Sequence, residues 1–375
     1  MQQSQEKQII QHGAWSFDKC KKQIFSYESD KTVPHFTEYQ NKDQNQSTSM
    51  SDIMDEAILN NYRKAGLVHK LIRSSLRNKA KAGTKFSELV DEAEMCLKKF
   101  LKPEDNGSFA FPLGISVNEV FAHDSSLPND DRTLKANDVL KLDLGIQISG
   151  CIVDSAWTMI VDADDDFADK YEPLILASAD AVYTGIKFAG PDVELYELSE
   201  YIQEVIESYE LNDGTKITPV MGLGGHNILP YKVHGKKLIL SKPHISQKNI
   251  RMEEGEFYAI ETFASTGSGN CTMRNLNCCS HFMLNEDDNF SKKIENTKNP
   301  VITWANTTHN SLPFTQKWCT EIKNSKQFLD SAIKERTVIA YPPLADKSGT
   351  YTSQLEHTIH IGAKSVEIFT LGNDY

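Results

Sequence analysis

The chain has 375 residues, 39% of them hydrophobic, which leaves room for a large core in one large domain or in two or three smaller ones. Its 40 basic and 52 acidic side chains give a net charge of −12, which argues against a partner bound through nucleic-acid phosphates. No apolar stretch reaches the roughly 18 residues of a membrane span, and the first residues lack a secretory signal pattern. We therefore expect a globular, monomeric protein of the cytoplasm.

The N-terminal segment differs in composition from the rest of the chain. Residues 1–50 are polar and rich in Gln, Asn, Asp and Lys, so we interpret them as an extension that ends in a linker. The segment also contains aromatic side chains that a fully disordered arm would not need, namely Trp15, Phe17, Phe25, Tyr27, Phe36 and Tyr39. We expect residues 14–40 to lie against the body of the protein.

A weak internal repeat follows in residues 51–375. Apolar residues at helical spacing predict helices over 53–71 and 86–97, separated by an Ala-Gly break and followed by strand patterns. The same order returns with helices over 171–187 and 195–206, again separated by Ala-Gly. Two successive copies of one pattern predict two similar halves related by a pseudo-twofold axis.

Residues 284–340 depart from this repeat. Toward the end of the stretch, aromatic and aliphatic residues recur at helical spacing, namely Trp304, Leu312, Phe314, Trp318, Ile322, Phe328, Leu329 and Ile333. So many apolar residues would not suit a loose loop. We expect a small folded helical insert.

Several acidic residues lie in apolar segments with strand character. Asp143 ends the run Val-Leu-Lys-Leu, Asp154 follows Cys-Ile-Val, and Glu261 follows Phe-Tyr-Ala-Ile. Carboxylates are poor strand residues and are almost never buried alone. For an isolated pair, an exposed strand face with solvated acids would be the simpler interpretation. The apolar flanks favour burial, and a pair of metal ions is then an economical source of compensating charge.

The two aspartates are predicted to share one face of a hairpin. Gln147-Ile-Ser-Gly150 resembles a turn, and a turn centred between Ile148 and Ser149 places Asp143 directly opposite Asp154. Side chains in that position have Cβ atoms roughly 5 Å apart. Two carboxylates at this distance would repel each other unless a cation lay between them.

The order of five motifs along the chain resembles the methionine aminopeptidases, and their type 2 branch in particular. These motifs are Asp143, Asp154, Gly224-Gly-His226, Ala259-Ile-Glu-Thr-Phe263 and Gln354-Leu-Glu-His-Thr358. Further matching strings lie at compatible spacings, namely Phe109-Ala-Phe-Pro-Leu-Gly114, Ala122-His123, Arg251-Met-Glu-Glu-Gly-Glu256 and Tyr341-Pro-Pro343. The resemblance covers nearly the whole chain after the first 51 residues.

The resemblance implies an α+β protein with the pita-bread fold, in which a curved antiparallel sheet carries outer helices in two pseudo-twofold halves. Residues 51–375 would form this metallopeptidase domain, and a helical insert at 284–340 would mark the type 2 branch. The metal ligands would divide between the halves. Asp143 and Asp154 come from the first, and His226, Glu261 and Glu356 from the second.

The resemblance also implies two divalent metal ions, for which Mn, Fe, Co and Zn all suit the ligands. Asp143 would chelate one ion, His226 and Glu261 would belong to the other, and Asp154 and Glu356 would bridge both. Four carboxylates carry a charge of −4 at neutral pH, which matches two divalent ions and leaves a bound hydroxide as the nucleophile. Metal-assisted hydrolysis of an amide bond follows.

Three further histidines have roles by resemblance. His123 would hydrogen-bond near the scissile amide, His234 would contact the substrate carbonyl, and His281 would line a methionine side-chain pocket together with Phe111 and Tyr341. A lone histidine is more often a structural residue, and the motif context reverses that preference for His123 and His234 and partly for His281. His357, beside Glu356, points to the opposite strand face and is expected to be structural.

The expected function is co-translational removal of the initiator methionine from nascent polypeptides, near the ribosome, when the second residue is small. Glu261 would also carry a proton to the departing nitrogen. The alternatives are an aminopeptidase of another specificity and a non-catalytic pita-bread relative that binds ribosomes or proteins, which predicts broken metal ligands. Pro230 and residues 269–277 depart from the family pattern. We expect Pro230 to stiffen the segment leading to His234, and residues 269–277 to reshape the rim of the pocket.

Overall fold

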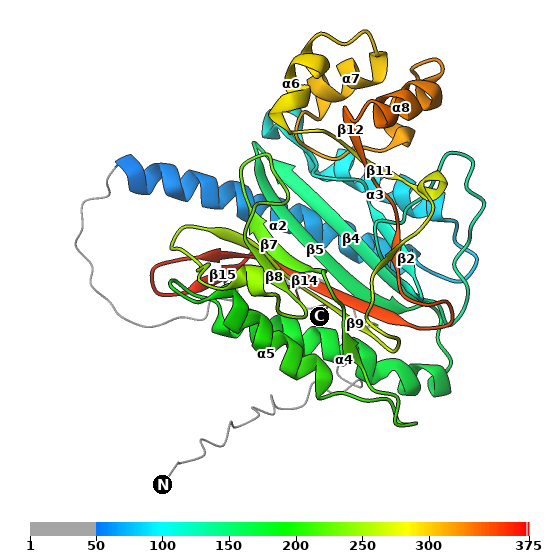
Figure 1. Ribbon diagram of the computed structural model, residues 1–375, viewed down its shortest axis with the longest axis vertical. Coiled ribbons are helices and arrows are strands. Elements are labelled where there is room, and N and C mark those ends of the chain that lie inside the picture. The colour runs from blue at the N-terminus through cyan, green and yellow to red at the C-terminus, as the bar shows by residue number, and fades with distance from the viewer. Residues whose placement is uncertain (1–49, 373, 375) are drawn as a thin grey trace.

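The computed structural model describes residues 50–372 and 374, so the expected packing of residues 14–40 lies outside the described residues. In its first half, helices α2 (Met50–Lys79) and α3 (Phe86–Phe100) are followed by the long strands β4 (Val139–Ile148) and β5 (Cys151–Ile160). α2 packs against both strands and α3 packs against α2, as Figure 1 shows. Shorter strands complete this half, namely β1 (Gly107–Phe109), β2 (Gly114–Val117) and β3 (Val120–Ala122).

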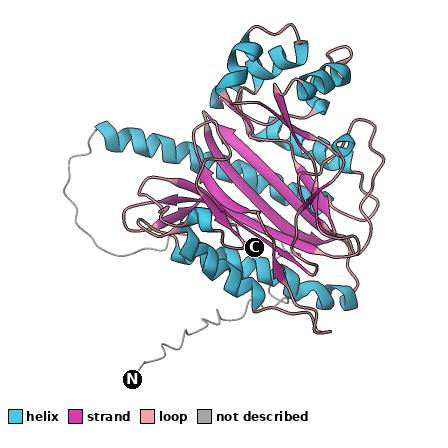
Figure 2. Ribbon diagram, viewed as in Figure 1, coloured by secondary structure: helices cyan, strands magenta, loops and turns pink. Residues whose placement is uncertain are grey.

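The second half repeats this order. Helices α4 (Asp165–Phe188) and α5 (Leu195–Glu207) precede the long strands β9 (Phe257–Ser265) and β14 (Thr352–Ile361), and α4 covers those strands. Its shorter strands are β6 (Thr218–Pro219), β7 (Gly224–Ile228), β8 (Leu238–Leu240) and β15 (Val366–Ile368). The repeat of two helices followed by a pair of long antiparallel strands confirms the predicted internal duplication (Figure 2).

The hairpin of β4 and β5 corrects one prediction. Ser149 has φ 51° and Gly150 has φ 85°, so a two-residue turn with left-handed backbone at both central positions joins Ile148 to Cys151. Asp154 therefore lies opposite Gly145, and Asp143 lies opposite Ala156. The predicted direct pairing of the two aspartates was wrong by a register shift of two. An even shift keeps both side chains on one face, as diagonal neighbours.

The two halves meet at a seam between β5 and β14, which belong to different sheets. Side-chain hydroxyls cross this seam. Thr358 Oγ1 accepts from Asp154 N at 2.7 Å and donates to Asp154 O at 2.6 Å. Thr158 Oγ1 accepts from Gln354 N at 2.8 Å and donates to Gln354 O at 2.7 Å. These bonds fix the backbone positions from which polar side chains enter the space between the halves.

The stretch between β11 (His281–Leu284) and β12 (Val338–Tyr341) is helical, as expected, and its two flanking strands pair antiparallel. It has its own core of buried residues, including Phe282, Phe314 and Leu329. Its helices are α6 (Asp288–Glu295), α7 (Pro300–Thr308), η4 (Gln316–Cys319) and α8 (Ser325–Lys334).

The remaining elements are short. They are the strands β10 (Thr272–Met273) and β13 (Leu344–Ala345) and the single turns η1 (Pro103–Asp105), η2 (Ile245–Gln247) and η3 (Leu276–Cys278). In the part of the chain that the structure describes, no helix is both long and apolar enough to span a membrane.

Candidate active site

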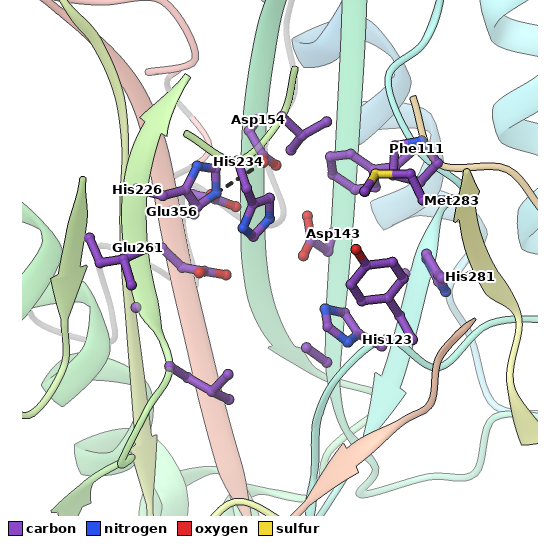
Figure 3. A pocket seen from close by; sticks show the side chains of 18 of the residues that line it. Phe111, His123, Asp143, Asp154, His226, His234, Glu261, His281, Met283 and Glu356 are labelled. Carbon is purple, nitrogen blue, oxygen red and sulfur yellow. Dashed lines mark ion pairs between the residues drawn. The ribbon is translucent and has the colours of Figure 1, made fainter. Parts of the chain in front are cut away.

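A cavity of about 280 Å³ opens between the two halves at the seam. Its lining includes every site residue predicted from the sequence. They are Phe111, His123, Asp143, Asp154, His226, His234, Glu261, His281, Tyr341 and Glu356. Figure 3 shows the acidic side chains and His226 gathered on one side of this space, with Phe111, His281 and Met283 facing them. Residues more than 200 positions apart in the sequence are thus brought together.

The acidic side of the cavity, which we call the carboxylate floor, consists of Asp143, Asp154, Glu261 and Glu356 together with His226. Asp154, His226 and Glu356 place ligand atoms within 4.8 Å of one another, and Asp143, Glu261 and Glu356 do the same. Glu356 is shared by both groups because it lies directly opposite Glu261 in the β9–β14 ladder. This grouping puts Glu261 beside Asp143, whereas the resemblance pairs Glu261 with His226 on one ion.

Burial makes the carboxylate floor electrostatically costly without a cation. It raises the pKa of Asp143 to about 6 and raises the pKa values of Asp154, Glu261 and Glu356 well above their usual range, and neighbouring carboxylates raise those three further. The oxygens Asp143 Oδ1, Asp154 Oδ1 and Glu356 Oε2 are buried without a hydrogen-bond partner. Unpaired buried anionic oxygens on converging strands fit divalent cations well.

His226 of the carboxylate floor forms a stacked pair with His234. Their ring centroids lie 3.8 Å apart, and His226 Nε2 lies 3.7 Å from Asp154 Oδ2. Burial lowers the pKa of His226 well below its usual range and that of His234 to about 4. Both imidazoles are therefore neutral near pH 7. A neutral His226 can ligate a metal, and a neutral His234 can donate one N–H to a substrate.

His123 lies directly after β3 in a backbone conformation that is unusual for its residue type. Its φ of 66° is left-handed, which is strained for a residue other than glycine and is often found at functional sites. The ring centroid lies 5.8 Å from that of Tyr341 and 6.0 Å from that of His281. Burial lowers the pKa of His123 to about 3, so this side chain too is neutral.

His281 lines the cavity without a free nitrogen. Nε2 lies 3.0 Å from the carbonyl oxygen of Pro112 and must donate to it, while Nδ1 lies 2.9 Å from Ser280 Oγ and accepts. His281 therefore contributes a fixed wall to the pocket. His357 points away from the cavity into the core, where Nδ1 lies 2.9 Å from Thr370 Oγ1, which agrees with a structural role.

The side of the cavity opposite the carboxylate floor, which we call the side-chain wall, consists of Phe111, His281, Met283 and Tyr341. Phe111 can lie there because Gly145 has no side chain, since a Cβ at Gly145 would be 2.2 Å from Phe111 Cε1. Sequence reasoning missed Met283. Its position two residues after His281 on a strand was the available signal, because both then share one face.

The departures from the family pattern have unequal effects on the cavity. The turn Leu229–Lys232, which we call the mouth turn, is closed by reciprocal backbone bonds of 3.0 and 2.9 Å, with Pro230 and Tyr231 at its centre. Lys232 forms an ion pair with Glu286 of the opposite side, and both residues line the cavity. Pro230 itself does not line the cavity, and stiffening of the segment that leads to His234 stays a prediction. None of residues 269–277 lines the cavity, so that expectation was wrong.

Comparisons with known proteins agree with this architecture. Metallopeptidase family M24 matches residues 60–297. Methionine aminopeptidase 2 of Kluyveromyces lactis is 36% identical over 331 residues, which cover 84% of this chain and 76% of that protein. The structure of a thermophilic Arx1 superposes with a TM-score of 0.68 at 16% identity, over 84% of this chain and 90% of that one. Methionine aminopeptidase of Thermotoga maritima superposes with a TM-score of 0.57 at 18% identity, over 84% and 97%.

The two structural likenesses show the fold, and the sequence matches show the family. The chain belongs to metallopeptidase family M24, and within that family to the methionine aminopeptidases 2. The pita-bread fold and the family expected from the sequence are thereby confirmed. The non-catalytic alternative predicted broken ligands, and it is not favoured because all five lie together in the cavity.

Proposed function

We propose that this metal-dependent aminopeptidase removes the initiator methionine from new polypeptides whose second residue is small. The observation that carries the proposal is one cavity that joins the carboxylate floor to an apolar side-chain wall. A methionine side chain can pack against Phe111, Met283 and Tyr341, because thioethers make favourable contacts with aromatic rings. The first peptide bond of the substrate then reaches the carboxylate floor.

The five residues of the carboxylate floor would hold two divalent ions, and Glu356 belongs to both groups of converging ligand atoms. Mn, Fe, Co and Zn all suit this mixture of carboxylates and one imidazole. When bound, such ions activate water and polarise the peptide carbonyl. The four buried carboxylates contribute four negative charges, which two divalent ions neutralise without any lysine or arginine among the ligands.

Three residues of the chain would bind the reacting groups of the substrate or transfer a proton. Neutral His234 donates a hydrogen bond to the substrate carbonyl oxygen, and neutral His123 lies where it can bond the departing nitrogen. The Glu261 carboxylate accepts a proton from the attacking water and passes it to that nitrogen. This role is supported by position, because Glu261 lines the cavity beside Asp143 and Glu356 in the carboxylate floor.

We also propose that the protein works as a monomer in the cytoplasm on chains leaving the ribosome. The support is chemical, because an initiator methionine is present only at the start of a newly made chain. A small second residue would be required because the peptide must pass the mouth turn and the Lys232–Glu286 ion pair on its way out of the cavity.

Metal-stripped protein tests the proposal with the peptides Met-Ala-Ser and Met-Gln-Ser, after Mn, Fe, Co or Zn is added back in turn. We expect release of methionine from Met-Ala-Ser in the presence of at least one metal, and little release from Met-Gln-Ser. Binding of two ions without cleavage of either peptide would reject the proposed activity while leaving the metal site in place.

A further inference from the structure

The seam hydrogen bonds reveal which residues of the two halves are equivalent. Thr358 holds the backbone of Asp154 through its N–H and C=O, and Thr158 holds the backbone of Gln354 in the same way. Thr158 lies four residues after Asp154, and Thr358 lies four residues after Gln354, so the two contacts are related by the exchange of the two halves. Gln354 therefore occupies in the second half the position that Asp154 occupies in the first.

The strand registers extend this equivalence to the other carboxylates. Asp143 lies opposite Ala156, which follows Asp154 by two residues. Glu261 lies opposite Glu356, which follows Gln354 by two residues. Asp143 and Glu261 are thus equivalent positions. If the second half repeated the first at this position, residue 354 would be a fifth carboxylate like Asp154. This chain has the amide of Gln354 there instead.

The amide of Gln354 contacts both members of the equivalent pair. Nε2 lies 2.6 Å from Glu261 Oε1 and 3.1 Å from Asp143 Oδ2, and the residue is only 1% exposed. The two amide hydrogens can serve one carboxylate each. The reversed amide would aim its oxygen at two anions, so the orientation is determined by charge. Gln354 Oε1 has no hydrogen-bond partner.

We propose that Gln354 is a positioning residue for the metal centre. Its amide holds one oxygen of Asp143 and one of Glu261, which links the carboxylates of the two halves and leaves their remaining oxygens available to the ions. Asp143 Oδ1, for example, is buried without a partner. Because the amide is neutral, it orders these ligands and keeps the floor at four negative charges. A carboxylate at position 354 would add a fifth.

Two substitutions separate this role from simple packing. Gln354→Met keeps the shape and removes the donors, whereas Gln354→Glu keeps the shape, removes the donors and adds a negative charge that can itself bind a cation. Leu355→Met is the matched control, because Leu355 is buried on the opposite strand face among core residues. Each variant is stripped of metal, checked by circular dichroism and thermal melting, and titrated with Mn²⁺ by calorimetry. Turnover of Met-Ala-Ser is then measured.

For Gln354→Met we expect Mn²⁺ affinity to fall about 10- to 100-fold for at least one ion, as is typical when a group that orients metal ligands is lost. At saturating Mn²⁺ we expect kcat to fall at least about tenfold, with KM within about threefold of the original value, because the substrate contacts remain. For Gln354→Glu we expect Mn²⁺ binding no weaker than in the unaltered protein, together with a similar loss of kcat.

The inference would be overturned if Gln354→Met had the same Mn²⁺ affinity and kcat as the unaltered protein. It would also be overturned if the Leu355→Met control weakened Mn²⁺ binding as much as Gln354→Met does. If Gln354→Met does not fold, Gln354→Glu decides, and unchanged kcat in that variant would reject the charge argument. Only the turnover measurement rests on the proposed function. If the unaltered protein binds two ions but cleaves no methionyl peptide, that function fails while the affinity test of Gln354 remains valid.

Discussion

The carboxylate floor and the mouth of the cavity are built in opposite ways. Asp154, Glu261 and Glu356 are at most 8% exposed and lie on three long strands, two of which are joined across the seam by threonine hydroxyls. The mouth is formed by the mouth turn and the helical insert, and the side chains of its ion pair, Lys232 and Glu286, are 38% and 32% exposed. The floor is buried and held by hydrogen bonds across the seam, whereas the mouth is open to solvent.

This difference suggests that the floor determines the rate of hydrolysis and the mouth determines which peptides are preferred. Buried charges that have lost a partner cannot be rescued by water, so a change in the floor should abolish catalysis. Ion pairs that reach solvent contribute little to stability, so a change at the mouth should alter which peptides are preferred and leave the reaction intact. The predictions below test this separation, from the largest expected effect to the smallest.

Glu356→Ala should have the largest effect, because Glu356 belongs to both groups of converging ligand atoms. We expect kcat/KM for Met-Ala-Ser to fall at least about 1,000-fold and Mn²⁺ binding to drop below two ions per chain, since a shared ligand serves both sites. Calorimetry and peptide hydrolysis measure both quantities. Retention of two ions with more than about a tenth of the original activity would contradict the arrangement of the floor.

His234→Ala should reduce turnover and leave metal binding unchanged. His234 stacks on His226 and is neutral because burial lowers its pKa to about 4, so its proposed contribution is one N–H bond to the substrate carbonyl. Loss of such a donor typically lowers kcat about 100-fold. His244→Ala, at the exposed histidine that directly precedes η2, is the control. A loss of bound Mn²⁺ in His234→Ala would instead indicate that the ring positions His226.

Three carboxylates of the floor stood out in the sequence because they break local rules, whereas His226 and Glu356 were identified through the family resemblance. Asp143, Asp154 and Glu261 are carboxylates within apolar strands, a conflict that a metal site resolves. The pairing of the two aspartates was wrong because a two-residue turn with positive φ at Ser149 fixes the register, and alternation of apolar residues cannot distinguish registers that differ by two.

Contacts across the seam were beyond sequence reasoning. Gln354 stood in a recognised motif, yet no local pattern shows that its amide reaches Asp143, which is 211 positions away. The Lys232–Glu286 ion pair at the mouth could not be predicted from the sequence either, because the distance between these two residues depends on how the helical insert packs. Strand periodicity determines which face a side chain occupies, and tertiary packing determines what that side chain meets there.

Removing the metals should make the stability of the protein depend on pH in a defined direction. Burial raises the pKa of Asp143 to about 6 and the pKa values of Glu261 and Glu356 well above their usual range, so in the metal-free folded state these carboxyl groups hold protons that the unfolded chain releases above about pH 4. Burial lowers the pKa values of His226 and His234, which opposes this trend below about pH 6.5, where these histidines are protonated only in the unfolded chain. Above that pH the carboxyl groups dominate, and stability is lost as pH rises through their raised pKa values.

For the metal-free protein we expect the melting temperature to fall by at least about 3 °C between pH 7 and pH 9, since each kcal/mol corresponds to roughly 1–2 °C in a chain of this length. Adding Mn²⁺ at pH 8 should reverse the loss, because ions replace the protons on the floor. A melting temperature that is independent of both pH and Mn²⁺ would show that the carboxylates are compensated by other means.

The smallest effects are expected at the mouth, and they should appear as a change of preference. Lys232→Met leaves Glu286 unpaired at the rim, so a peptide with lysine at its third position should gain relative to one with aspartate by about threefold in kcat/KM, within the range of exposed charge interactions. Glu286→Gln should shift the ratio the other way, and the double variant should restore it. The ratio of kcat/KM for Met-Ala-Lys and Met-Ala-Asp measures the shift.

An unchanged ratio in both single variants would mean that the peptide leaves the cavity away from this ion pair. The residues that select the peptide would then be sought at Leu238 and Pro313, which also line the cavity.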